Sequence, residues 1–135
     1  MSEEKIVRVK DVMTKDFDFI DGMDTVGNVL RNMTHSEARA LIVRKRDDDD
    51  EYGMLLISDI ARKVLAQDKP PDRVNVYEIM AKPVIMVYPD MQIKYCARLL
   101  DRFGLTRVPV VELGEVVGIV SFGDLVLRGF RDHQL

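Results

Sequence analysis

The chain has 135 residues, of which 47% are hydrophobic and 32% are charged, and its net charge is −3. This size fits one ordinary globular domain, or two small ones that share a core. Its apolar runs are shorter than the roughly 18 residues that span a bilayer, and its acidic balance argues against a nucleic-acid partner. The Met-Ser-Glu-Glu-Lys start does not resemble a signal peptide, so we expect a cytoplasmic protein without a membrane partner.

The sequence contains an internal duplication, because Val9–Lys15 resembles Val76–Lys82 and Met80 follows Met13 by 67 residues. Further pairs at spacings of 65 to 67 residues are Ile20 with Val87, Val29 with Cys96, Val43 with Val110, Gly53 with Gly118 and Asp59 with Asp124. We therefore predict two repeats, 9–66 and 76–131, joined by a linker at 67–75 and forming one compact module.

Each repeat begins with a short helical turn that ends at Met13 or Met80 and leads into an extended segment. The extended segment 17–20 belongs to an alternation of Asp16, Phe17, Asp18 and Phe19 before Ile20, and this pattern is typical of a half-exposed strand. Residues 84–88 are all apolar, and this pattern predicts a segment that is buried on both faces.

A helix follows in each repeat, with apolar side chains at the spacing of one helix face. Asp24 or Asp90 can cap the start of these helices, and Gly104 suits the left-handed residue that ends the second one. The single cysteine, Cys96, falls on the apolar face of the second helix, where we expect a small buried core residue.

Two short strands joined by a hairpin and a closing helix complete each repeat. The predicted strands are 41–43, 54–57, 108–111 and 116–120, and the predicted closing helices are 58–66 and 123–131. Residues 67–72 contain two prolines and are predicted to be extended. The order β-α-β-β-α occurs twice, which predicts an α+β fold. Each repeat has a marginal core alone, so we expect the two to pack sheet to sheet with pseudo-two-fold symmetry.

The stretch Gly118–Leu125 places polar side chains where an apolar strand runs into a helix. Ser121 leaves a hydroxyl and Asp124 a carboxylate beside the free N–H groups of the helix start. Such a carboxylate can accept both hydroxyls of a ribose; the alternative is an ordinary helix cap. Arg107 can fork onto two phosphate oxygens, with a plain surface arginine as the alternative. Pro109 removes a backbone donor, which suits a strand edge with room for a ligand alongside.

The tandem β-α-β-β-α order, with Arg107-Val-Pro-Val-Val111 and Gly118-Ile-Val-Ser-Phe-Gly-Asp124, resembles a pair of cystathionine-β-synthase (CBS) domains, or Bateman module, over residues 9–130. This resemblance implies a stand-alone regulatory module without catalytic activity or cofactor. It would bind an adenine nucleotide in a cleft between the repeats and signal by a conformational shift. AMP is the first candidate, with ADP and ATP next. The resemblance also implies a homodimer and a regulated partner protein that the sequence does not identify.

The resemblance implies where the nucleotide would bind. The adenine would lie against the second extended segment, and Arg107, Ser121 and Asp124 would hold the phosphate and the ribose. The implied nucleotide-binding residues are Ala81, Lys82, Pro83, Val84, Ile85, Arg107, Pro109, Ser121 and Asp124. A second cleft would be lined by Thr14, Lys15, Arg39 and Asp59. This cleft is the weaker one, because Leu56 stands in place of Ser121.

Other interpretations stay open. A CBS pair can serve as a dimerisation and interaction scaffold that binds no nucleotide. Alternatively, the cleft can hold another adenosyl ligand, such as S-adenosylmethionine or NAD, for which Arg107 would matter little. An enzyme is disfavoured, because no paired acid and base or nucleophile stands out. No metal is expected, since the acidic run Asp47–Glu51 lacks the ligand spacing of a calcium loop and His35 and His133 are interpreted as surface residues.

Overall fold

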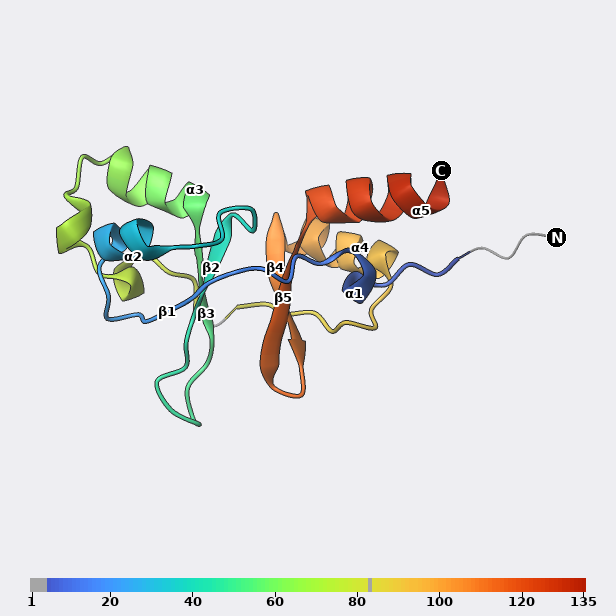
Figure 1. Cartoon of the computed structure of the whole chain (residues 1–135), viewed down its shortest axis with the longest axis horizontal. Coiled ribbons are helices and arrows are strands. Elements are labelled where there is room, and N and C mark those ends of the chain that lie inside the picture. The colour runs from blue at the N-terminus through green and yellow to red at the C-terminus, as the bar shows by residue number, and fades with distance from the viewer. Residues whose placement is uncertain (1–4, 83) are drawn as a thin grey trace. The chain divides into compact units, whose positions relative to one another are not determined.

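The computed structural model describes residues 5–82 and 84–135 (Figure 1). Contacts divide the chain into two compact units. Unit 1 consists of Met1–Lys15 together with Ile85–Leu135, and unit 2 consists of Asp16–Val84. The start of the first repeat thus folds with the second repeat, and the start of the second repeat folds with the first.

Unit 2 contains a three-stranded sheet in the order β1-β2-β3. Its elements are β1 (Phe19–Ile20), α2 (Val26–Asn32), β2 (Ala40–Val43), β3 (Gly53–Leu56), α3 (Ile57–Ile60), the π-helical turn Ala61–Leu65, and 3₁₀ turns at Pro71–Arg73 and Val76–Glu78. β1 runs parallel to β2, and β2 runs antiparallel to β3 with Leu41 opposite Leu55. All four residues of β2 are buried, as expected for an apolar strand in the middle of a sheet. The core joins Leu41 and Leu55 to Val29 of α2 and Val64 of the last helical turn.

Unit 1 contains an antiparallel pair of strands, β4 and β5, and the helices that pack with them. Its elements are α1 (Val9–Val12), α4 (Ile93–Phe103), β4 (Arg107–Glu112), β5 (Glu115–Ser121), the π-helical segment Asp124–Arg131 and α5 (Asp132–Gln134). Figure 1 shows α1 beside α4, although about eighty residues separate them in the chain. Their shared core contains Val12 and Cys96, so the prediction of a buried cysteine is confirmed. Gly104 ends α4 with a φ of +65°, as predicted.

Each repeat's leading methionine packs on the glycine in the other repeat's hairpin. A Cβ atom added to Gly118 would lie 2.7 Å from the sulfur of Met13, and one added to Gly53 would lie 2.9 Å from the sulfur of Met80. A side chain does not fit at these two positions without displacing the methionine. The methionine and the glycine that mark the duplication in the sequence therefore contact each other. In each unit, the methionine comes from one repeat and the glycine from the other.

The prediction that Asp24 and Asp90 cap the helices was wrong. Thr25 is the N-cap of α2, and its hydroxyl accepts the backbone N–H of Asn28 at 3.1 Å. The carboxylate of Asp24 instead accepts the N–H of Thr25 at 2.9 Å. The carboxylate of Asp90 pairs with Lys10 Nζ at 3.0 Å. In both helices the residue directly before the first turn, and not the nearest acidic residue, takes the cap position.

The prediction that residues 84–88 are buried on both faces was also wrong. Val87 is buried, but Ile85 and Met86 are 36% and 37% exposed and Tyr88 is 68% exposed. Val87 joins β4 through an isolated bridge to Val110, so the segment lies along an edge and is not a strand inside a sheet. An apolar run of five residues alone does not distinguish these two environments.

The linker is less extended than its prolines predicted. Pro71–Arg73 forms a 3₁₀ turn with proline at the first position. An N–H group at this position would have no acceptor within the turn, so the proline costs no hydrogen bond. The carboxylate of Asp72 in this turn accepts from Arg31 at 2.7 Å and so ties the linker to the end of α2.

The α+β fold class is confirmed by the helices and small sheets of both units. Across residues 5–82 and 84–135, the helices are too short or too polar to traverse a bilayer.

Candidate functional site

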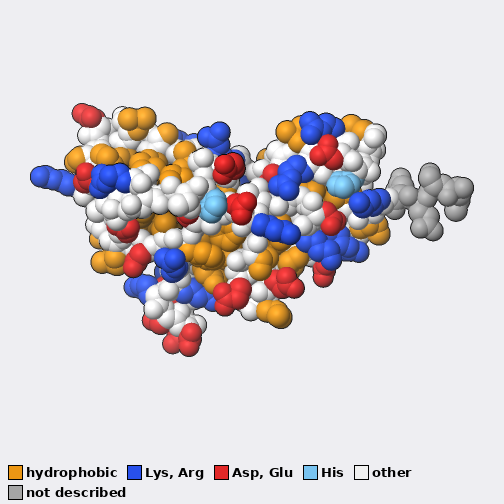
Figure 2. Space-filling view, viewed as in Figure 1, with side chains coloured by type: hydrophobic (Ala, Val, Ile, Leu, Met, Phe, Trp, Pro, Cys, Tyr) orange, Lys and Arg blue, Asp and Glu red, His pale blue; other side chains and the backbone are white. Residues whose placement is uncertain are grey.

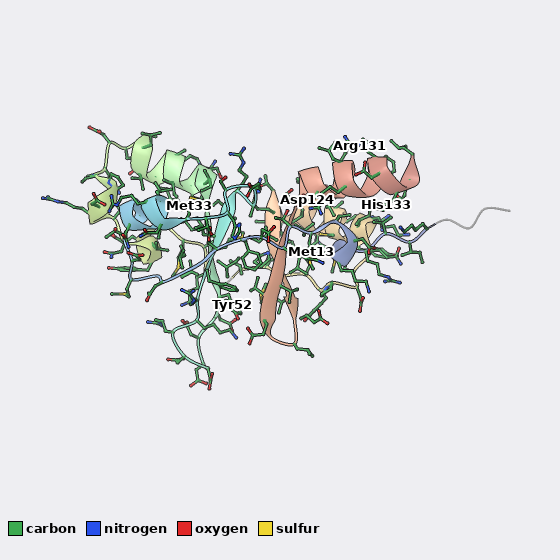
Figure 3. All side chains as sticks on the ribbon, viewed as in Figure 1. Met13, Met33, Tyr52, Asp124, Arg131 and His133 are labelled. Carbon is green, nitrogen blue, oxygen red and sulfur yellow. The ribbon has the colours of Figure 1, made fainter. Side chains whose placement is uncertain are left out.

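The predicted polar residues of unit 1 gather at one end of the β4–β5 pair. Arg107 begins β4 and lies opposite Ser121, which ends β5. Asp124 follows three residues later, in the first turn of the last helix, where Figure 3 shows it at the junction of strand and helix. All three side chains are half-buried. This end of unit 1 thus offers a guanidinium, a hydroxyl and a carboxylate on adjacent elements.

Ser121 and Asp124 bind each other reciprocally. The backbone N–H of Asp124 donates to Ser121 Oγ at 3.1 Å, and the backbone N–H of Ser121 donates to Asp124 Oδ2 at 3.0 Å. This is the hydrogen-bond pattern of a capping box, so the cap role weighed from the sequence is present. The other carboxylate oxygen, Oδ1, lies 3.7 Å from Arg128 Nη1. An ionised carboxylate has about four lone-pair sites, so this arrangement leaves acceptor capacity for a ligand hydroxyl.

Thr14 lies beside the same strand end. Its N–H donates to the carbonyl of Ile119 at 2.8 Å, and its carbonyl accepts the N–H of Ile119 at 2.9 Å. Ile119 precedes Ser121 by two residues, so the side chains of these two residues lie on the same face of the strand. Thr14 and Lys15 were predicted for the second cleft, but the structure places them in unit 1 with Ser121 and Asp124. The duplication is the sequence signal that could have predicted this contact. Ala81, the equivalent of Thr14, pairs in the same way with Met54, the equivalent of Ile119.

Pro109 is buried within β4, opposite Ile119. Its carbonyl faces away from β5 and accepts the N–H of Val87 at 3.1 Å. The proline nitrogen points to the same side, so it costs the β4–β5 pair no hydrogen bond, as expected on a strand edge. However, Val87 occupies the edge at this point, where room for a ligand was predicted.

The predicted adenine-binding segment lies mainly in unit 2. Ala81 pairs with Met54, and Lys82 Nζ lies 2.6 Å from Asp50 Oδ1. Val84 is half-buried in unit 2, and the exposed Ile85 belongs to unit 1. Pro83 lies outside the described residues.

The residues of the weaker predicted site in unit 2 lack the reciprocal pattern. Leu56 stands where unit 1 has a serine hydroxyl, and the carboxylate of Asp59 pairs with Arg62 Nη2 at 3.0 Å. Arg39 has a φ of +57°, and its carbonyl accepts the N–H of Ile57 at 3.1 Å, so it shapes the entry into β2.

Acidic groups elsewhere are paired locally. Asp50 binds Lys82 and the backbone and side chain of Arg46, and Lys82 is the main cause that holds the pKa of Asp50 well below its usual range. Among residues 5–82 and 84–135, no three His, Cys, Asp or Glu side chains lie close enough to hold a metal ion. His35 is half-buried and its backbone N–H donates to Asp18 at 2.9 Å, whereas His133 is exposed.

The chain matches the CBS domain family over residues 9–66 and again over residues 76–129. It therefore belongs to the CBS domain family, and the two matches make it a tandem CBS pair. An uncharacterized protein of Methanopyrus kandleri is 33% identical over 93 residues, which cover 68% of this chain and 46% of that protein. The chain spans about half the length of the first curated relatives it matches, 46% and 55%.

Solved structures give the same result. The hexameric CBS-CP12 protein from bloom-forming cyanobacteria matches with a TM-score of 0.88 and 33% identity, over 96% of this chain and 76% of that one. The CBS domain pair of protein MJ0100, in complex with 5′-methylthioadenosine and S-adenosyl-L-methionine, matches with a TM-score of 0.70 and 26% identity, over 91% of this chain and 95% of that one.

Proposed function

We propose that this CBS pair is a regulatory module that binds an adenine nucleotide at the Ser121 end of unit 1. AMP is the first candidate, with ADP and ATP next. Nucleotide binding shifts the conformation of the module, and a partner protein recognises this change. The carrying observation is that Thr14, Arg107 and the Ser121–Asp124 junction come from three separate places in the chain and lie at one end of the β4–β5 pair. Their chemistry matches a nucleoside phosphate.

Each group has a distinct role in this proposal. The carboxylate of Asp124 accepts the ribose hydroxyls, since its Oδ2 is already oriented by the N–H of Ser121. Arg107 donates a fork of N–H groups to the phosphate. Thr14 and Lys15 add a hydroxyl and an ammonium group beside β5.

The ligand of the MJ0100 pair supports the adenosyl part of the proposal, because that related pair binds two adenosyl compounds. Those two ligands carry no phosphate, whereas Arg107 is the group that favours a phosphate in this chain. The second repeat thus supplies the better site, and Arg39 and Asp59 of unit 2 supply the weaker one.

We also propose that the chain forms a homodimer through the helix 124–131. Val126, Leu127 and Phe130 of this helix are 52%, 49% and 50% exposed, and Figure 2 shows apolar side chains at its surface on the upper right. Three large apolar side chains on two turns of one helix are typical of an interface. The related CBS-CP12 protein is hexameric, which supports self-association. Light scattering on the purified chain tests this proposal: a dimer mass supports it and a monomer mass contradicts it.

A scaffold that binds no nucleotide is the second candidate, and the reciprocal hydrogen bonds of Ser121 and Asp124 favour it, because a capping box explains both residues without a ligand. Calorimetric titration with AMP, ADP, ATP, NAD and S-adenosylmethionine distinguishes the two. Saturable binding of a nucleotide that weakens in Arg107→Met supports the nucleotide module. Binding of S-adenosylmethionine that is unaffected by Arg107→Met identifies a different adenosyl ligand. A folded chain that binds none of the five is the scaffold.

A further inference from the structure

We propose that unit 2 carries a separate small-molecule site, a cavity of about 470 Å³ beyond the end of β2, for an aromatic anion that Arg44 binds. Cavities of about 300–1,000 Å³ hold small organic ligands. All the residues that line this cavity belong to Asp16–Val84, so the site is complete within one unit.

The wall of the cavity is apolar and aromatic. Val43 and Met80 line it together with Tyr77, whose side chain is 51% exposed, and Met23, which is 68% exposed. The backbone N–H of Tyr77 donates to the carbonyl of Gly22 at 2.9 Å, which holds the aromatic residue beside the one lining position that has no side chain. An exposed Tyr and Met around a hollow offer the flat and adaptable contacts that an aromatic ring prefers.

The rim of the cavity is basic. Arg44, Arg46 and Lys82 line it against one carboxylate, that of Asp21, whose Oδ1 already accepts the N–H of Met23 at 2.8 Å. Asp50 lies outside the lining and binds both Lys82 Nζ at 2.6 Å and Arg46 Nε at 3.2 Å, so it offsets about one of the three cations. One positive charge therefore remains at the rim, and it favours an anion.

Arg44 is the cation best placed to meet that anion. Its guanidinium lies over the ring of Phe19 at 5.7 Å, and its backbone N–H donates to the carbonyl of Ile20 at 2.9 Å. The backbone is therefore fixed in the sheet register, while the exposed guanidinium can fork onto a carboxylate or phosphate group.

Apart from Lys82, which was also predicted for the adenine-binding segment, the residues that line this cavity differ from those of both predicted nucleotide clefts. Arg39 and Asp59 flank the start of β2 and the end of β3, whereas Arg44 follows the end of β2. The four residues of β2 separate Arg39 from Arg44, and five steps along an extended chain span a distance of roughly 17 Å. An occupant of one end of the strand therefore leaves the other end open, and this proposal does not depend on nucleotide binding.

Backbone amide shifts of the ¹⁵N-labelled full chain test the proposal, with phenyl phosphate as the anionic aromatic probe. We expect saturable shifts at Gly22, Met23 and Arg44 with a Kd of about 1 mM. Benzylamine, which has the same ring and the opposite charge, should give none. Arg44→Met should weaken binding about tenfold, while Lys45→Met, next in the chain with its ammonium 4.8 Å from the Tyr52 ring, should change it little.

Gly22→Leu provides a second variant that fills the cavity and keeps the charges. Its Cβ would meet Val43 Cγ1 at an ordinary 3.4 Å, so the unit should fold, and binding of phenyl phosphate should be lost. The proposal is overturned by an absence of saturable shifts at these amides, by equal binding of benzyl alcohol, or by unchanged binding in both Arg44→Met and Gly22→Leu. Inorganic phosphate that binds as tightly as phenyl phosphate would remove the aromatic part of the assignment.

Discussion

Gly118→Ala tests the crosswise contact that builds unit 1. The new Cβ would lie 2.7 Å from the Met13 sulfur and 3.1 Å from the Thr14 carbonyl oxygen, both shorter than ordinary contacts. The sulfur is the end of a flexible side chain and can move, but the Thr14 carbonyl is held by its hydrogen bond to Ile119 at 2.9 Å. Overpacking of this kind costs about 1–3 kcal/mol, so we expect a fall in the free energy of unfolding of about 2 kcal/mol.

Urea unfolding measures this change, and Gly123→Ala provides the matched control. A Cβ at Gly123 would lie 3.6 Å from Ser121 Oγ, and its φ and ψ of −58° and −44° are helical. Alanine at this position should therefore leave stability unchanged or raise it by up to about 1 kcal/mol. Wild-type stability of Gly118→Ala would refute the inference that this glycine exists for the approach of the Met13 segment.

A double-mutant cycle assigns the cost to its cause. Met13→Ala removes the sulfur, so the penalty of Gly118→Ala should shrink in that background by about 1 kcal/mol. The part that remains belongs to the Thr14 carbonyl. If the two changes are additive, the clash with the methionine is not what makes alanine unfavourable.

Three further predictions concern single side chains. Ser121→Ala and Asp124→Ala should each lower the free energy of unfolding by about 0.5–2 kcal/mol. The double variant should lose less than the sum of the two, because the two hydrogen bonds form one cap, and additive losses in urea melts would contradict this. Asp50→Asn should destabilise unit 2 at neutral pH. Lys82 lowers the pKa of Asp50 in the folded state, so this stabilisation is fully present above the unfolded pKa of about 3.9 and is lost progressively as the pH falls from there through the lower folded pKa. A stability difference between the two proteins that does not shrink as the pH falls below about 3.9 would refute the pairing. Burial raises the pKa of the Cys96 thiol to about 11, so iodoacetamide should modify it only in denaturant, and rapid alkylation of the native chain at pH 8 would contradict its burial.

The duplication predicted much of the fold, because both repeats carry the same apolar periods and the same landmark glycines. Helix and strand positions follow from such local patterns, and most of them agree with the structure. Exact starts were less accurate: the cap of α2 fell to Thr25 and not to Asp24, since several side chains near a helix start compete for the same N–H groups.

The crosswise packing of Met13 and Met80 could not be predicted from spacing, because it depends on contacts between residues far apart in the chain. Thr14 was therefore predicted to lie with Arg39, whereas in the structure it pairs with Ile119, next to the site of Ser121. Backbone pairing with a residue far away in the chain thus determines the site at which a side chain lies.

Nucleotide binding by the Ser121 end of unit 1 is tested most directly by calorimetric titration of AMP into Asp124→Asn and Asp59→Asn. Two hydrogen bonds from ribose hydroxyls to an ionised carboxylate are together equivalent to about a hundredfold in affinity. We expect saturable binding to the wild-type chain, a loss of about that size in Asp124→Asn, and little change in Asp59→Asn. Wild-type affinity in Asp124→Asn, or a loss confined to Asp59→Asn, would contradict the assignment of the ribose to Asp124.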